Sequence, residues 1–83
     1  MLRRISMKLV DFLECELVNN TMYIRTSCYI NPKHVVYVEE DEEHEGYTFI
    51  GLVGANPTIV KGTAKEVKEK LEGRKWLKIL HLQ

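Results

Sequence analysis

Alternation of apolar and polar residues with a period of two runs through most of the first sixty residues of this chain. In residues 21–30, TMYIRTSCYI, the even-numbered positions are mostly apolar, while Tyr23, Arg25 and Tyr29 share the odd-numbered side. Successive side chains of a strand point to opposite faces of a sheet. This segment therefore predicts a half-buried antiparallel strand.

The preceding segment KLVDFLECELV, residues 8–18, also alternates. It places Leu13, Cys15 and Leu17 on one side, with Val10 and Phe12 on the other. Asn19-Asn20 separates it from residues 21–30, and asparagine tolerates the positive φ angles of a tight hairpin turn. The sequence thus predicts a two-stranded hairpin in which directly opposed residue numbers sum to 39.

Three further strands follow from composition. VVYVEE (35–40) and YTFIGLVG (47–54) are β-branched and aromatic on both faces, which favours central strands, and TIVK (58–61) is a short one. Asn31 to His34, with proline second, is typical of a β-turn. DEEHEG (41–46) has the length and the glycine of a hairpin loop.

Residues 64–72 carry the one strong helical signal. Thr63 and Glu66 form a capping-box pattern, and Gly73 is placed as a C-terminal stop. Ala64, Val67 and Leu71 fall on one face, so a helix this short must pack on the sheet to be stable. The segment RKWLKILHLQ (74–83) fits either a final strand or a second helix, and we favour the strand.

The predicted fold class is α+β: a small, curled antiparallel β-meander of about five strands, with one C-terminal helix packed on a face and room for a final strand at 74–83. The 83 residues are expected to form a single domain spanning 1–83, in which residues 1–6 are either disordered or the product of an upstream start. No apolar run reaches the roughly 18 residues needed to span a bilayer. We expect a cytoplasmic protein without a membrane span.

Two cysteines fit no disulfide in the predicted hairpin register. Cys15 would face Ile24 and Cys28 would face Asp11, so the two thiols are not opposed, as a bridge requires. We expect two buried free thiols.

An acidic cluster surrounds the 41–46 loop. Its members are Glu39, Glu40, Asp41, Glu42, Glu43 and Glu45. The spacing lacks the alternating ligands and closing glutamate of a calcium loop, so we interpret it as a solvated hairpin tip.

Catalytic and metal-binding patterns are missing from the sequence. His34, His44 and His81 show no zinc spacing, and no Ser or Cys nucleophile is paired with a base. We therefore expect a non-enzymatic chain without metal or cofactor.

A candidate interaction surface is predicted from the aromatic residues and Arg25. Its members are Tyr23, Arg25, Tyr29, Tyr37 and Trp76. One hypothesis is that these side chains make protein contacts, including those of a homodimer, because the strands are apolar on both faces and one helix cannot cover both. The alternative is a small nucleic-acid-binding or prophage-encoded regulatory protein, in which the tyrosines and Arg25 stack on bases beside Lys61, Lys65, Lys68 and Lys70.

Two segments, YINPKHVVYVEE (29–40) and GLVGANPTIVKGTAKEVKEKL (51–71), resemble the FlbD/SwrD family associated with bacterial flagella and swarming. The resemblance covers roughly residues 22–72. The matching positions are Ile30, Asn31, Val35, Val38, Glu39, Ile50, Leu52, Gly54, Val60, Lys61, Thr63 and Val67. It implies a small bacterial interaction protein that acts through an unknown protein partner.

A second, fainter similarity runs through YIRTSCYINPKHVVYVEE (23–40). This segment is similar to the LytTR DNA-binding domain, and the similarity implies nucleic-acid binding.

Overall fold

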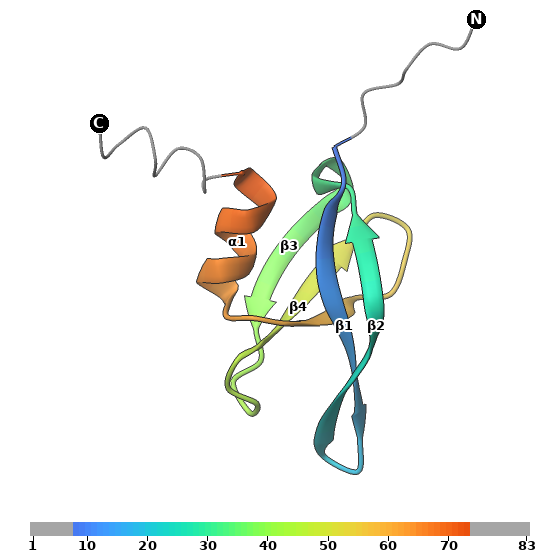
Figure 1. The fold of residues 1–83 in the computed structure, drawn as a ribbon, viewed down its shortest axis with the longest axis vertical. Helices are drawn as coiled ribbons and strands as arrows, with labels where there is room; N and C mark the ends of the chain where they lie inside the picture. The colour runs from blue at the N-terminus through green and yellow to red at the C-terminus, as the bar shows by residue number, and fades with distance from the viewer. Residues whose placement is uncertain (1–7, 74–83) are drawn as a thin grey trace, which may run out of the picture.

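The computed structural model of the protein describes residues 8–73, which form one sheet and one helix (Figure 1). The elements are β1 (Val10–Val18), β2 (Thr21–Ile30), a 3₁₀ turn (Pro32–His34), β3 (Val35–Glu40), β4 (Tyr47–Leu52), β5 (Thr58–Lys61) and α1 (Ala64–Glu72). All strand pairs are antiparallel. The predicted α+β class with five strands and one C-terminal helix is confirmed. The predicted final strand at 74–83, with Trp76, lies outside the described residues.

The strand order is β2-β1-β5-β4-β3, so β2 and β3 are the two edges of the sheet. Three of the four consecutive strand pairs are neighbours, as in a meander, whereas β2 and β3 do not pair. Between them the Asn31 side chain accepts a hydrogen bond from the Lys33 amide, and the His34 amide donates to the Asn31 carbonyl. This Pro32 turn carries the chain from one sheet edge to the other.

The core is a single cluster to which both ends of the sheet contribute. Val10, Phe12 and Ile30 come from β1 and β2, and they pack with Ile50 of β4, Val60 of β5 and Val67 of α1. Val35 and Val38 of the far edge strand β3 pack against the same cluster. A sheet whose two ends meet one core must be curled, and it stays open between β2 and β3.

The helix begins and ends where the sequence predicts. The Glu66 amide donates to Thr63 Oγ1 at 3.1 Å, and the Thr63 amide donates to Glu66 Oε1 at 2.9 Å, which completes a capping box. Such a cap stabilises a helix by about 1 kcal/mol. Gly73 ends α1 with φ 69°, in the left-handed region. Val67 is 1 % exposed and anchors the helix in the core.

Both edge strands contain a β-bulge, which the periodicity did not predict. In β2 the extra residue is Arg25, because Glu14 faces Thr26 while Cys15 faces Ile24. In β3 it is Val36, because Leu52 faces Val35 while Gly51 faces Tyr37. Bulges on edge strands discourage pairing with a further strand.

The β2 bulge also changes the predicted hairpin register. Asn19 and Asn20 have φ of 50° and 64°, which confirms the tight turn, and Cys15 faces Ile24 as expected. Beyond Arg25 the register slips by one, so Cys28 faces Phe12, and the predicted pairing with Asp11 is wrong. Both cysteines remain free thiols; Cys15 is buried, whereas Cys28 is only partly so.

One buried polar side chain ties the sheet to the start of the helix segment. Thr48 is 0 % exposed, and its hydroxyl donates to the Gly62 carbonyl at 2.7 Å. Gly62 precedes the Thr63 cap, so this bond fixes the point where the chain leaves β5 for α1.

We expect Thr48→Val to lower the free energy of unfolding by about 1–3 kcal/mol, because it leaves the partly buried Gly62 carbonyl without its donor. Urea unfolding monitored by circular dichroism measures the change. Thr26→Val is the matched control, since the Thr26 hydroxyl makes only an exposed bond, to the Ser27 carbonyl. Equal effects of the two substitutions would contradict this role for the Thr48 hydroxyl.

Candidate protein interaction surface

An apolar row crosses four strands on the face of the sheet that points away from the core cluster. Directly opposed residues place Ile24 of β2 beside Cys15 of β1, Cys15 beside Ile59 of β5, and Ile59 beside Phe49 of β4. Opposed residues in a sheet share a face, and neighbours along a strand alternate between faces. Val60 and Ile50, the chain neighbours of Ile59 and Phe49, belong to the core cluster. The row therefore lies on the other face of the sheet. We call it the second face.

The second face is apolar but only partly buried. Cys15 is 5 % exposed, whereas Ile24 at one end of the row is 54 % exposed. Leu17, two residues beyond Cys15 on β1, is 44 % exposed and faces the half-buried Met22. The helix does not shield this surface, because α1 enters the core cluster on the opposite side of the sheet through Val67.

Tyr37 extends the second face to the far edge strand. It lies directly opposite Gly51, and a Cβ atom on Gly51 would overlap its ring. Gly51 is buried under that ring, while Tyr37 itself is 43 % exposed. The glycine within the YTFIGLVG strand is therefore required by the close approach of an aromatic ring.

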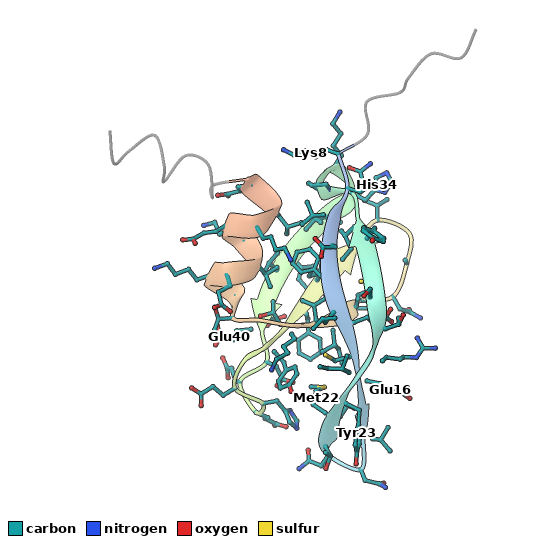
Figure 2. The ribbon with its side chains drawn as sticks, in the orientation of Figure 1. Lys8, Glu16, Met22, Tyr23, His34 and Glu40 are labelled. Carbon is teal, nitrogen blue, oxygen red and sulfur yellow. The ribbon has the colours of Figure 1, made fainter. Side chains whose placement is uncertain are left out.

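The structure separates the residues that the alternation had placed together on β2. Tyr23 faces Glu16 and Tyr29 faces Asp11, and these two partners lie five residues apart on β1, on opposite faces. The expectation that Tyr23, Arg25 and Tyr29 share one face is wrong, because Arg25 is the bulged residue and reverses the alternation. Figure 2 shows Tyr23 near the turn of the β1–β2 hairpin.

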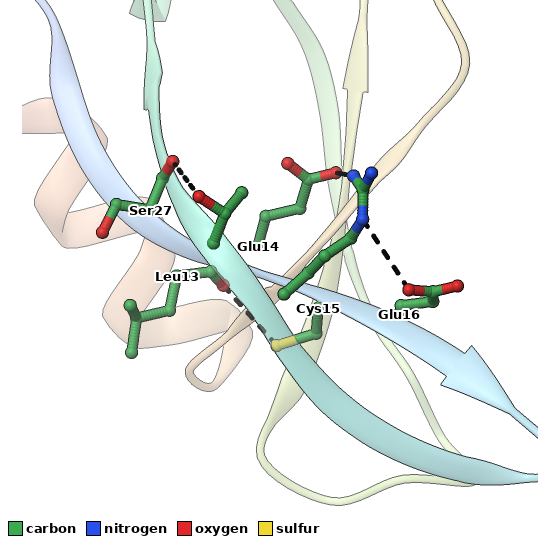
Figure 3. Close-up of polar contacts among 7 residues, drawn as sticks. Leu13, Glu14, Cys15, Glu16 and Ser27 are labelled. Carbon is green, nitrogen blue, oxygen red and sulfur yellow. Dashed lines mark hydrogen bonds and ion pairs between the residues drawn. The ribbon is translucent and has the colours of Figure 1, made fainter.

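Arg25 is engaged within the hairpin. Its Nη1 atom lies 3.4 Å from Glu14 Oε2, and its Nε atom lies 3.7 Å from Glu16 Oε1. The dashed lines in Figure 3 mark both ion pairs, to carboxylates two residues apart on β1. A guanidinium held between two carboxylates is less available to a phosphate group.

Two lysines of the predicted basic patch also have partners in the fold. Lys61 Nζ lies 5.3 Å from the centroid of the Tyr47 ring. Lys70 Nζ lies 4.8 Å from the centroid of the Phe12 ring and 3.8 Å from Asp11 Oδ1. Such cation–π contacts hold the lysine stems against the protein. Two of the four lysines of the predicted basic patch are therefore held against other parts of the fold.

The acidic cluster is a hairpin tip, as predicted, except at Asp41. Glu39, Glu40, Glu42, Glu43 and Glu45 are exposed, whereas Asp41 is only 8 % exposed. Asp41 Oδ1 accepts a hydrogen bond from the Glu43 amide at 2.9 Å, and Oδ2 lies 3.0 Å from His44 Nδ1. The interpretation of the whole cluster as solvated is wrong for Asp41, because its carboxylate organises the loop.

Two contacts join this loop to the rest of the fold. His44 Nε2 lies 3.3 Å from the Asn20 carbonyl, which links the acidic loop to the β1–β2 turn at the same end of the molecule. Glu40 Oε1 accepts a 3.4 Å hydrogen bond from the Ala64 amide in the first turn of α1, close to the helix start in Figure 2. Carboxylates are favoured there by the helix dipole.

Other chemistry has little support within residues 8–73. In this part of the chain, no group of three or more His, Cys, Asp and Glu side chains is arranged to hold a metal ion. Desolvation by burial raises the pKa of both the Cys15 and the Cys28 thiol. Thiols with a raised pKa form little thiolate near neutral pH and are weak nucleophiles.

Comparison of the chain with protein-family models, with curated proteins and with solved structures finds no match. Of the helices in residues 8–73, none has the length and apolar character needed to cross a membrane.

The Asp41 contacts predict an acid-dependent contribution to stability. The Glu43 amide is the largest cause that lowers the pKa of Asp41 from its ordinary 3.8; His44 lowers it further, and desolvation opposes both. A lowered pKa means that the stabilisation is present above pH 3.8 and is lost as the pH falls through the folded value. We expect Asp41→Asn to be less stable than the wild type at pH 7, with a smaller difference at pH 2–3.

Urea unfolding at both pH values measures this difference. Glu42→Gln is the control, because it removes an exposed charge from the same loop. A penalty for Asp41→Asn that is the same at both pH values would show that the Asp41 charge is not responsible.

The Tyr37–Gly51 contact predicts that Gly51→Ala lowers the free energy of unfolding by about 1–3 kcal/mol, the usual range for overpacking. The added methyl group must displace the Tyr37 ring from the second face. A double-mutant cycle with Tyr37→Ala tests this: Gly51→Ala should cost less when the ring is gone. If the two costs simply add, the ring contact is not the cause.

Proposed function

We propose that this chain is a non-enzymatic protein-interaction module of the cytoplasm, and that it acts as a homodimer through its second face. The observation that carries the proposal is the apolar row Ile24–Cys15–Ile59–Phe49, continued by Tyr37 over Gly51. Soluble monomers rarely leave a contiguous apolar surface of this kind partly open to water. The non-enzymatic part of the proposal comes from the sequence, which pairs no nucleophile with a base.

The bulges favour a contact through the face over a contact through the edges. The two edges of the sheet formed by residues 8–73, β2 and β3, each carry an extra residue that interrupts regular pairing with another strand. A second copy is therefore better accommodated against the side chains of the second face. A twofold axis would set the same apolar row of each copy against the other, as isologous dimers require.

The FlbD/SwrD resemblance supports the fold of the module more than its role. Seven of its matching positions are residues of the core cluster or pack against it: Ile30, Val35, Val38, Ile50, Leu52, Val60 and Val67. Residues in such positions report on packing. On the basis of this resemblance we propose that the protein acts in bacterial motility, through an unknown protein partner. Flagellar genes next to the gene for this protein would support that role.

Nucleic-acid binding has less support from the geometry. Arg25 lies between two glutamates, Tyr23 and Tyr29 lie on opposite faces, and Lys61 and Lys70 contact aromatic rings of the fold. Binding that weakens steeply with added salt in a mobility-shift assay would revive this alternative.

For the homodimer, we expect Ile24→Lys to weaken dimerisation about tenfold or more. A tenfold loss corresponds to about 1.4 kcal/mol, and burying an unpaired ammonium group in an apolar interface costs at least that. Sedimentation equilibrium over a range of protein concentrations measures the dissociation constant.

Val18→Lys is the matched control, since Val18 is 40 % exposed on the other face of the same hairpin. It should leave the dimer unchanged. A wild-type protein that stays monomeric at high concentration would refute the homodimer. Equal effects of the two lysine substitutions would show that the second face is not the dimer interface.

A further inference from the structure

A groove of about 470 Å³ runs between the edge strand β3 and the helix α1. One side includes Pro32 of the 3₁₀ turn with Val35 and Val36 of β3, and the helix side includes Lys68, Leu71 and Glu72. Leu71 and Val35 both pack partly against the core cluster, so the floor of the groove is apolar. It lies beside the helix at the β3 edge and meets the second face only at Tyr37, which also lines the groove.

The β3 bulge adds an exposed apolar side chain to this groove. Val36 is the extra residue of the bulge and is 64 % exposed, beside a groove that already contains Val35 and Leu71. An exposed valine on an edge strand beside other apolar side chains favours an apolar occupant. The occupant should therefore present large apolar side chains.

We infer that the occupant is the chain's own C-terminal segment, residues 74–83. The helix ends at Glu72, so the segment starts beside two groove residues, Leu71 and Glu72. Gly73, with φ 69°, ends the helical path there and turns the chain. RKWLKILHLQ supplies Trp76, Leu77, Ile79, Leu80 and Leu82 as apolar side chains.

Length and attachment both favour this segment over a separate molecule. An extended residue spans about 3.3 Å, so ten residues reach roughly 33 Å, more than the ~20 Å of a six-residue strand such as β3. A segment tethered at the rim of the groove has a high effective concentration there. It would thus fill the groove ahead of a second chain and cover the β3 edge.

Trp76 makes the inference directly testable, because it is the only tryptophan of the protein. In the wild-type chain we expect a Trp76 emission maximum at a shorter wavelength than in urea, with reduced quenching by acrylamide. Val36→Lys should shift the emission to longer wavelength and raise the quenching constant towards its value in urea. Circular dichroism verifies that the variant is folded.

Val53→Lys is the matched control, since Val53 is also a valine, is 66 % exposed, and follows β4 outside the groove. It should leave Trp76 shielded. Equal effects of the two lysines, or wild-type quenching as strong as in urea, would overturn the inference. Shielding that grows with protein concentration would also overturn it, in favour of a segment donated by a second copy.

Ile24→Lys separates this inference from the proposed homodimer. If Trp76 stays shielded in that variant at any oligomeric state, the segment binds within its own chain and the groove assignment holds. If Ile24→Lys exposes Trp76, the tryptophan belongs to the dimer contact and the groove assignment is wrong.

Discussion

Burial of one small cluster, shared by both ends of the sheet and the helix, is the constraint on which the rest of this structure depends. Phe12 and Ile30 reach it from one end, Val35 and Val38 from the other, and Val67 from α1. A chain of this size has little apolar surface to bury, so a flat sheet would leave one end without a core. Curling lets one cluster stabilise all the elements, and it leaves β2 and β3 as edges that no other strand of residues 8–73 pairs with.

The two bulges are best understood from that constraint. Arg25 and Val36 interrupt the two strands that remain open when the sheet curls without closing. Each bulge bends its strand and discourages another strand from adding to it. The exposed apolar surface is then displaced to the second face and to the β3–α1 groove, where side chains rather than backbone groups would mediate contacts.

Charge in this protein mostly supports the architecture. Arg25 bridges Glu14 and Glu16 within one hairpin, and Glu40 reaches the first turn of α1. Asp41 and His44 connect the acidic loop to the Asn19–Asn20 turn. The neutral net charge therefore conceals a set of local pairings that hold the two hairpins and the helix together.

Local signals in the sequence determined the elements of this protein, and the tertiary structure decided which side chains come together. The Asn19–Asn20 turn, the Pro32 turn, the capping box at Thr63 and the stop at Gly73 depend on near neighbours, so each could be predicted. The alternation of β1 correctly separated Val10 and Phe12 from Cys15, but all three are buried, which the alternation alone did not indicate. The alternation of β2 failed at Arg25, because a bulge reverses the faces there, and a bulge in a curled sheet depends on packing between distant strands. For the same reason the second face, assembled from four strands, and the Asp41–His44–Asn20 link could not be found by spacing along the chain.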